Sequence, residues 1–190
     1  MLWSRAVSRP GSQQRRSSAL SDCRGARVLA GAHSAWTAAV PADTIAPMER
    51  RYQEIVDGLL AATAASRVTI RLERPGETLP IVAEALAPGI PSLQGPSTID
   101  LRAAPTVRYL AETLGTLIRD DLLETDTPPP PELIQQYGAR AQMLAAVGVD
   151  GTLAAIVSVH YSPGPRHWTE AEVAALEAAA ARVREIIAGA

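Results

Sequence analysis

The sequence has very little cysteine and lacks lysine, asparagine and phenylalanine altogether. Cys23 is the single cysteine among 190 residues, so no internal disulfide can form, and a reducing, cytoplasmic compartment is the default expectation. No cysteine and histidine residues have the spacing of a metal site, and we expect no metal. No apolar run is long enough to cross a bilayer, which argues against a membrane role. The missing residue types have AT-rich codons, so a GC-rich, bacterial genome explains their absence.

Positive charge is concentrated in residues 1–47. This segment holds six arginines and two aspartates, whereas residues 48–190 hold twelve arginines and eighteen acidic residues. Its Ser, Gln, Gly and Arg content shows no hydrophobic periodicity, so we interpret it as lying outside the fold. It could be a disordered tail, sequence read from a start codon upstream of a true start at Met48, a targeting peptide, or a basic arm for nucleic acid. Scattered arginines without interleaved aromatics are a weak nucleic-acid signal, and we expect no nucleic-acid partner.

The expected domain, residues 48–190, opens with a helical pattern followed by a hairpin pattern. Apolar residues recur at three- and four-residue spacing at Tyr52, Ile55, Leu59 and Ala62. This spacing predicts an amphipathic helix. The stretch RVTIRLERPGETLPIVAEAL then predicts two strands joined by a Pro-Gly turn. In the first strand, one face should carry Val68, Ile70 and Leu72, and the opposite face should carry Thr69 and Arg71.

The middle of the chain is irregular, and the C-terminal third is strongly patterned. TVRYLAETLG predicts a short helix ended by Gly115, TLIRD a short strand, and a proline-rich loop leads into another short helix. Residues 139–149 and 152–161 predict two strands joined by an Asp150-Gly151 turn. The second strand is apolar on both faces for most of its length, so we expect it in the middle of a sheet covered on both sides. Thr169 and Glu172 form a capping box that predicts a final helix.

This order of elements resembles the GAF domain family. The resemblance covers roughly Met48 to Ala188, and its specific part is YGARAQMLAAVGVDGTLAAIVSVHYSPGPRHWTEAEVAALEAAAARV. The family usually has a proline near Ala146 and a glycine near Ala155, and this sequence replaces both. The resemblance implies an α+β fold, a GAF-like, PAS-related three-layer sandwich. Its central antiparallel sheet would carry the terminal helices on one face and a pocket with short helices on the other.

A fold of this kind is compatible with a ligand sensor, an enzyme or a docking domain. We favour a non-catalytic sensor that binds a small molecule, with a ligand-free dimerisation or docking domain as the alternative. Some members of the family reduce methionine sulfoxide with pocket cysteines, but here the only thiol is Cys23, in the first segment. Ser158 and His160 share one face of a strand, as is common in strands. We therefore expect no catalytic residues.

The cofactors of the family each require residues that this sequence lacks or, for haem, supplies through one histidine alone. Covalent bilin attachment needs a pocket cysteine. Members that bind cyclic nucleotides carry an Asn-Lys-Phe-Asp-Glu motif, which a chain without Asn, Lys or Phe cannot contain. Haem would need His160 as an axial ligand, and a lone histidine on an apolar strand is more often hydrogen-bonded in place. We therefore expect no cofactor.

The polar side chains expected on the pocket face form the candidate binding site. Alternation in the first strand and the resemblance to pigment-binding relatives select Thr69, Arg71, Gln142, Ser158 and His160. A few polar groups in an apolar cleft are typical of a small-molecule site, and an arginine there favours a carboxylate or another anion. The alternative is that Arg71 only pairs with Glu84 on the adjacent strand.

The last helix carries an apolar stripe that suggests a partner helix. Its members step by three and four residues: Val173, Leu176, Ala180, Val183 and Ile187. Ile186 and many alanines widen this apolar arc, so we expect a homodimer. The sequence includes no output domain, so a sensor of this kind would act through dimer geometry or a signalling partner protein.

Overall fold

The computed structural model of the chain describes residues 42–95, 101–125, 129 and 131–189. The chain divides into two units, Met1–Ala38 and Ala39–Ala190. Most of the expected tail, including Cys23, lies outside the described residues. Helix α1 (Ala42–Thr63) begins ahead of Met48 and contains Pro47, so the expected boundary between residues 47 and 48 falls inside a helix. The periodic set that predicts this helix begins at Tyr52 and therefore misses the start, although Ile45 and Met48 continue the same three- and four-residue spacing.

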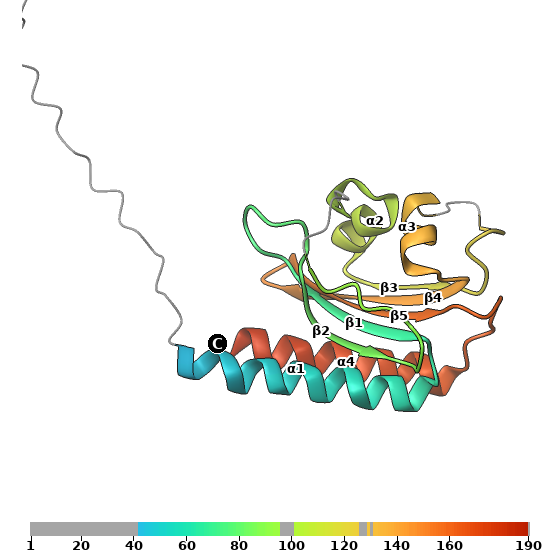
Figure 1. Ribbon diagram of the computed structural model, residues 1–190. Helices are drawn as coiled ribbons and strands as arrows, with labels where there is room; N and C mark the ends of the chain where they lie inside the picture. The colour runs from blue at the N-terminus through green and yellow to red at the C-terminus, as the bar shows by residue number, and fades with distance from the viewer. Residues whose placement is uncertain (1–41, 96–100, 126–128, 130, 190) are drawn as a thin grey trace, which may run out of the picture. The chain divides into compact units, whose positions relative to one another are not determined.

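Five strands form one antiparallel sheet with the order β2-β1-β5-β4-β3 (Figure 1). The strands are β1 (Arg67–Leu72), β2 (Ile81–Leu86), β3 (Thr116–Arg119), β4 (Ala141–Val149) and β5 (Thr152–Tyr161). Helices α1 and α4 (Glu170–Ala188) cover one face. The opposite face carries the shorter helices η1 (Leu101–Ala103), α2 (Pro105–Thr113) and α3 (Pro131–Tyr137). This arrangement confirms the predicted three-layer α+β sandwich, with β5 in the middle of the sheet.

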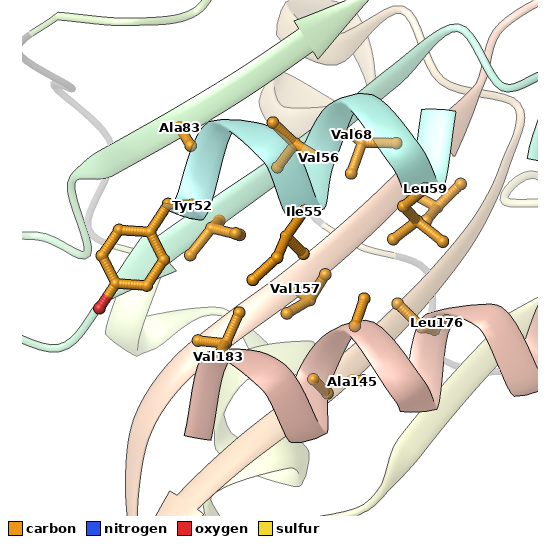
Figure 2. Close-up of a cluster of buried hydrophobic side chains, with 14 of the residues drawn as sticks. Tyr52, Ile55, Val56, Leu59, Val68, Ala83, Ala145, Val157, Leu176 and Val183 are labelled. Atoms are coloured by element: carbon orange, nitrogen blue, oxygen red, sulfur yellow. The ribbon is translucent and has the colours of Figure 1, made fainter. Parts of the chain in front are cut away.

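The larger hydrophobic core lies between the sheet and the two long helices (Figure 2). Tyr52, Ile55 and Leu59 are buried there, as the helical spacing predicts. Ala62 is exposed, and the buried residue near the end of α1 is Thr63, whose hydroxyl donates to the Leu59 carbonyl at 2.8 Å. A hydroxyl satisfied within its own helix can be buried, so this polar residue takes the place that the apolar pattern assigned to an alanine.

The alternation of side chains in β1 and β5 divides the sheet into two chemically different faces. Val68, Ile70 and Val157 belong to the core under α1 and α4. Ile156 and Leu144 belong to a second, smaller apolar cluster under the short helices. Because side chains in a strand point alternately to the two faces, the polar residues between these positions lie on the short-helix side.

A hairpin turn and the end of a helix position the paired strands β4 and β5, which carry part of the site. Asp150 (φ 51°) and Gly151 (φ 75°) both have positive φ, which is the geometry of the tight hairpin turn predicted at this point. Helix α2 ends with Leu114 in the left-handed region (φ 51°) rather than at Gly115. The side chain of Leu114 packs directly over Gly148, where an added Cβ would lie 3.0 Å from a Leu114 methyl carbon. This contact holds a leucine in a conformation that the sequence pattern assigned to glycine.

The corner between β5 and α4 is formed by a stacked arginine and a helix cap. Thr169 and Glu172 make the predicted capping box at the start of α4. The Arg166 guanidinium lies 4.7 Å from the Tyr161 ring centre and 4.6 Å from that of Trp168, and it forms an ion pair with Glu172.

None of the described helices has the length and apolar character needed to cross a membrane.

Candidate ligand-binding site

A small cavity lies between the sheet and the short helices, with a volume of about 60 Å³. Four of the five predicted site residues line it: Arg71, Gln142, Ser158 and His160. Thr69 is fully buried and lies opposite Ser158 in the β1–β5 register, but it does not line the cavity. The structure therefore places all five on the predicted face of the sheet, and four of them around one space.

Strand register explains why residues far apart in the sequence meet here. His160 of β5 lies opposite Arg67 of β1 and opposite Gln142 of β4. These three residues form one row across the sheet, and Thr69 and Ser158 begin the adjacent row. Arg67 was not among the predicted site residues, although strand alternation places it on the same face as Thr69 and Arg71.

Arg67, and not Arg71, is the partner of the buried Glu84. The Arg67 Nε lies 3.3 Å from Glu84 Oε1, and both side chains are almost fully buried. Arg67 also donates through Nη1 to the Tyr137 carbonyl at 3.0 Å. The Glu84 carboxylate accepts further hydrogen bonds from the Ser92 hydroxyl at 2.5 Å and from the Leu93 N–H at 3.1 and 3.2 Å. Glu84 is thus fully engaged, and the expected Arg71–Glu84 alternative is wrong.

Arg71 is buried against neutral oxygen atoms only. Arg71 as a whole is 8% exposed. Nη1 donates to the Leu79 carbonyl at 2.5 Å, and Nη2 donates to the Tyr137 hydroxyl at 2.6 Å. In the part of the chain that the structure describes, no carboxylate forms an ion pair with it. A buried cation without an anionic partner is energetically unfavourable, which marks this position as unusual for a purely structural residue.

Five buried polar atoms on the same face have no hydrogen-bond partner among the described residues. Two of them are the Nε atoms of Arg67 and Arg119, and the other three belong to predicted site residues. These three are Thr69 Oγ1, Gln142 Nε2 and His160 Nδ1, and each belongs to a residue that is at most 5% exposed. Leaving a buried polar group unpaired costs roughly 1–3 kcal/mol. Two of these atoms belong to residues that line the cavity, so a ligand or ordered water in the cavity could satisfy them.

His160 is a neutral imidazole at the centre of the site. Its burial, together with the nearby charges of Arg67 and Arg71, lowers the pKa of His160 to about 3. The Tyr137 ring lies against it, with ring centres 4.7 Å apart and planes inclined by 47°. No acidic side chain among the described residues orients His160, since Nδ1 is unpartnered. Ser158 and His160 therefore lack the third member that a hydrolytic triad requires.

Tyr137 is, with Arg67, a residue of the site that sequence reasoning missed. It ends α3, contacts both arginines and His160, and also lines the cavity. The sequence places it after a proline-rich loop, in the stretch with the weakest pattern. The one available signal was an aromatic residue at the end of a short predicted helix facing the pocket.

The residues present do not fit the larger cofactors of related folds. A cavity of about 60 Å³ is several-fold below the ~300 Å³ that drug-sized ligands need at minimum. A linear tetrapyrrole or a haem group therefore does not fit between the sheet and the short helices as they stand. Within the described residues, no three His, Cys, Asp or Glu side chains gather where they could hold a metal ion.

Comparisons with known proteins agree with this architecture. The GAF domain model matches residues 47–187. A search of curated proteins finds no match. Among solved structures, the PixJ GAF domain of Thermosynechococcus elongatus is similar, with a TM-score of 0.65 and 16% identity, over 78% of this chain and 92% of that one.

Bacteriophytochrome structures are similar as well. The chromophore-binding domain from Stigmatella aurantiaca has a TM-score of 0.60 and 17% identity, over 80% of this chain and 62% of that one. The corresponding domain from R. palustris has the same TM-score and identity, over 77% of this chain and 61% of that one. At these identities the likeness supports the fold alone, whereas the family match spans most of the sequence. The chain therefore belongs to the GAF domain family.

Proposed function

We propose that this GAF domain is a non-catalytic sensor that binds a small anion in the cavity beside Arg71. The observation that carries the proposal is the buried Arg71 guanidinium, which among the described residues has neutral acceptors only, although it lines a cavity. A carboxylate could accept two parallel N–H bonds from such a guanidinium and neutralise its charge. The unpartnered amide of Gln142 lines the same cavity and supplies a further donor to the anion.

The charges around the cavity favour an anion that carries a single negative charge. Arg67 and Arg71 are cationic, Glu84 supplies one carboxylate, and His160 is neutral because its pKa is about 3. The site therefore carries one uncompensated positive charge. The cavity volume of about 60 Å³ is roughly four to six times the 10–15 Å³ that one water requires. A ligand with only a few non-hydrogen atoms matches both the charge and the size.

A thermal-shift screen with small carboxylates tests the proposal. At a ligand concentration one hundred times its Kd, stabilisation is about 2.7 kcal/mol, which raises Tm by roughly 5–10 °C for a protein of this size. Arg71→Met should abolish the shift. Arg74→Met is the matched control, because the Arg74 side chain is half exposed and its ion-pair partner within the described residues is Glu77 at 3.9 Å.

The result that refutes the anion sensor is equally specific. If no small carboxylate raises the Tm of the full chain at millimolar concentration, the proposal fails. Shifts that survive Arg71→Met would show that any binding occurs elsewhere. In either case the ligand-free docking domain becomes the better description of this protein.

The output of the sensor is proposed to pass through a homodimer or a signalling partner that uses the layer of α1 and α4. The specific observation is that five apolar residues of α1 and α4 remain only partly buried: Met48, Leu60, Val173, Ala175 and Ile187. A second helical surface would bury them further. Size-exclusion chromatography with light scattering tests this part, and a monomer at micromolar concentration would leave only the partner protein.

A further inference from the structure

Tyr137 links the proposed anion site to helix α3. Its hydroxyl accepts a hydrogen bond from Arg71 Nη2 at 2.6 Å, and its carbonyl accepts one from Arg67 Nη1 at 3.0 Å. The centre of its ring lies 5.7 Å from the Arg67 guanidinium carbon and 5.9 Å from that of Arg71. The end of α3 is therefore held on the sheet by the same two arginines that give the site its charge.

The Tyr137 hydroxyl occupies the place on Arg71 that an anion would take. A phenol oxygen satisfies one guanidinium N–H, but it leaves the positive charge uncompensated. A carboxylate forms shorter, charge-assisted bonds and can accept from two N–H groups of one guanidinium. Nη2 of Arg71 carries two N–H bonds, and one of them is donated to the Tyr137 hydroxyl. A carboxylate that takes the bidentate position including this N–H competes with the hydroxyl directly.

The rest of the cavity restricts the ligand to a short chain. Leu79, Leu144 and Ile156 line it together with the polar residues, so part of its wall is apolar. An apolar wall favours an alkyl group over a second charged group, because a second charge would be buried without a partner. The volume of about 60 Å³ leaves space for only a few carbon atoms.

We propose that the ligand is a short-chain monocarboxylate that displaces the Tyr137 hydroxyl from Arg71 and so releases the end of α3 from the sheet. This inference rests on the proposed anion site. It adds the class of ligand and a physical readout, because occupancy of the cavity is coupled to the attachment of α3 to the sheet. Helix α3 lies on the face of the sheet opposite to α1 and α4 (Figure 1). The Arg67 bond to the Tyr137 carbonyl remains as a second attachment, which limits the movement to the side chain and the last turn of α3.

Propionate is a suitable probe, with propionamide as an uncharged control of the same shape. For about five non-hydrogen atoms, the best attainable Kd is on the order of 3 μM, so calorimetric titrations should extend from micromolar to millimolar propionate. Tyr137→Phe removes the competing hydroxyl while leaving the backbone carbonyl and the ring. Because the lost bond involves a charged donor, this variant should bind propionate roughly ten- to one hundredfold more tightly than the wild type.

Tyr109→Phe is the matched control, because Tyr109 is 44% exposed on α2; it should bind propionate as the wild type does. Hydrogen exchange supplies the second measurement. In the wild type, propionate should accelerate amide exchange in α3. In Tyr137→Phe, exchange in α3 should be fast already and should not respond to propionate.

The outcomes separate this inference from the function on which it rests. If acetate, propionate and butyrate all fail to bind the wild type, both fail. If propionate binds in an Arg71-dependent manner but Tyr137→Phe binds it no more tightly, the displacement is wrong and the anion site stands. Protection of α3 on propionate binding would also overturn the displacement. Equal binding of propionamide would overturn the assignment of a carboxylate.

Discussion

Acidification should destabilise this protein through His160 well before its carboxylates are protonated. His160 is 5% exposed and faces the guanidinium groups of Arg67 and Arg71, the ring of Tyr137 and the amide of Gln142. Protonation would place a third cation in this group, where Glu84 is the one carboxylate that the described residues supply. The imidazole therefore stays neutral in the folded chain, with a pKa of about 3 against 6.5 for an unperturbed histidine.

The sign of the effect follows from proton binding. Between pH 6.5 and about 3 the unfolded chain binds a proton at His160 and the folded chain does not, so the free energy of unfolding decreases as the pH is lowered. The full interval corresponds to roughly 5 kcal/mol, and the step from pH 7 to pH 5 to about 2 kcal/mol. The lowered pKa values of Asp121 and Glu172 act in the same direction only below about pH 4.5. From pH 7 to pH 5 these two carboxyl groups therefore do not mask the effect of His160.

Urea unfolding followed by circular dichroism at pH 7 and pH 5 measures the effect. The wild type should lose about 2 kcal/mol more over this interval than His160→Gln, because glutamine does not titrate. His167, on the surface, is present in both proteins, so its contribution cancels in the comparison. Equal losses in the two proteins would mean that His160 accepts a proton in the folded state, and the neutral, enclosed site described here would be wrong.

Two other substitutions test the interactions around the site and the corner beside it. Arg67→Met leaves the buried Glu84 without its cation and should lower the free energy of unfolding by about 3–5 kcal/mol. Adding Glu84→Gln should recover part of this loss, and a double variant no more stable than Arg67→Met would contradict the ion pair. Thr169→Ala removes the cap of α4 and should cost about 1 kcal/mol, seen as a fall in Tm of roughly 2–4 °C. An unchanged Tm would show that the capping box contributes nothing.

The fold was predictable because its signals are local and mutually consistent. Alternation in β1 separates Val68 and Ile70 from Thr69 and Arg71, and the Asp150-Gly151 turn fixes the pairing of β4 with β5. Once the pairing is fixed, the period of two in each strand determines which side chains share a face. The predicted polar set meets on one face for this reason. The start of α1 and the end of α2 were not predicted, since they depend on a helix that contains a proline and on Leu114 packing over Gly148.

Tyr137 could not be predicted, because its role depends on contacts between segments far apart in the chain. It is more than sixty positions away from both Arg67 and Arg71 in sequence. No periodicity in the short helix α3 determines where that helix lies relative to the sheet. Placement of such a helix depends on tertiary contacts rather than on local propensity. Sequence reasoning therefore identified four strand residues that line the cavity but not Tyr137, which lines it from α3.

The choice between a structural and a ligand-binding role for Arg71 depends on a competition that only the structure resolves. Glu84 lies opposite Thr69, midway between the two arginines along β1, so the sequence alone allows it to pair with either. Two features assign it to Arg67. The segment after β2 donates to Glu84 and accepts from Arg67 through the Pro91 carbonyl at 2.6 Å, and the β1–β2 register shifts between Ile70 and Arg71. Because one carboxylate cannot neutralise both cations, Arg71 is left as the charge that a ligand can balance.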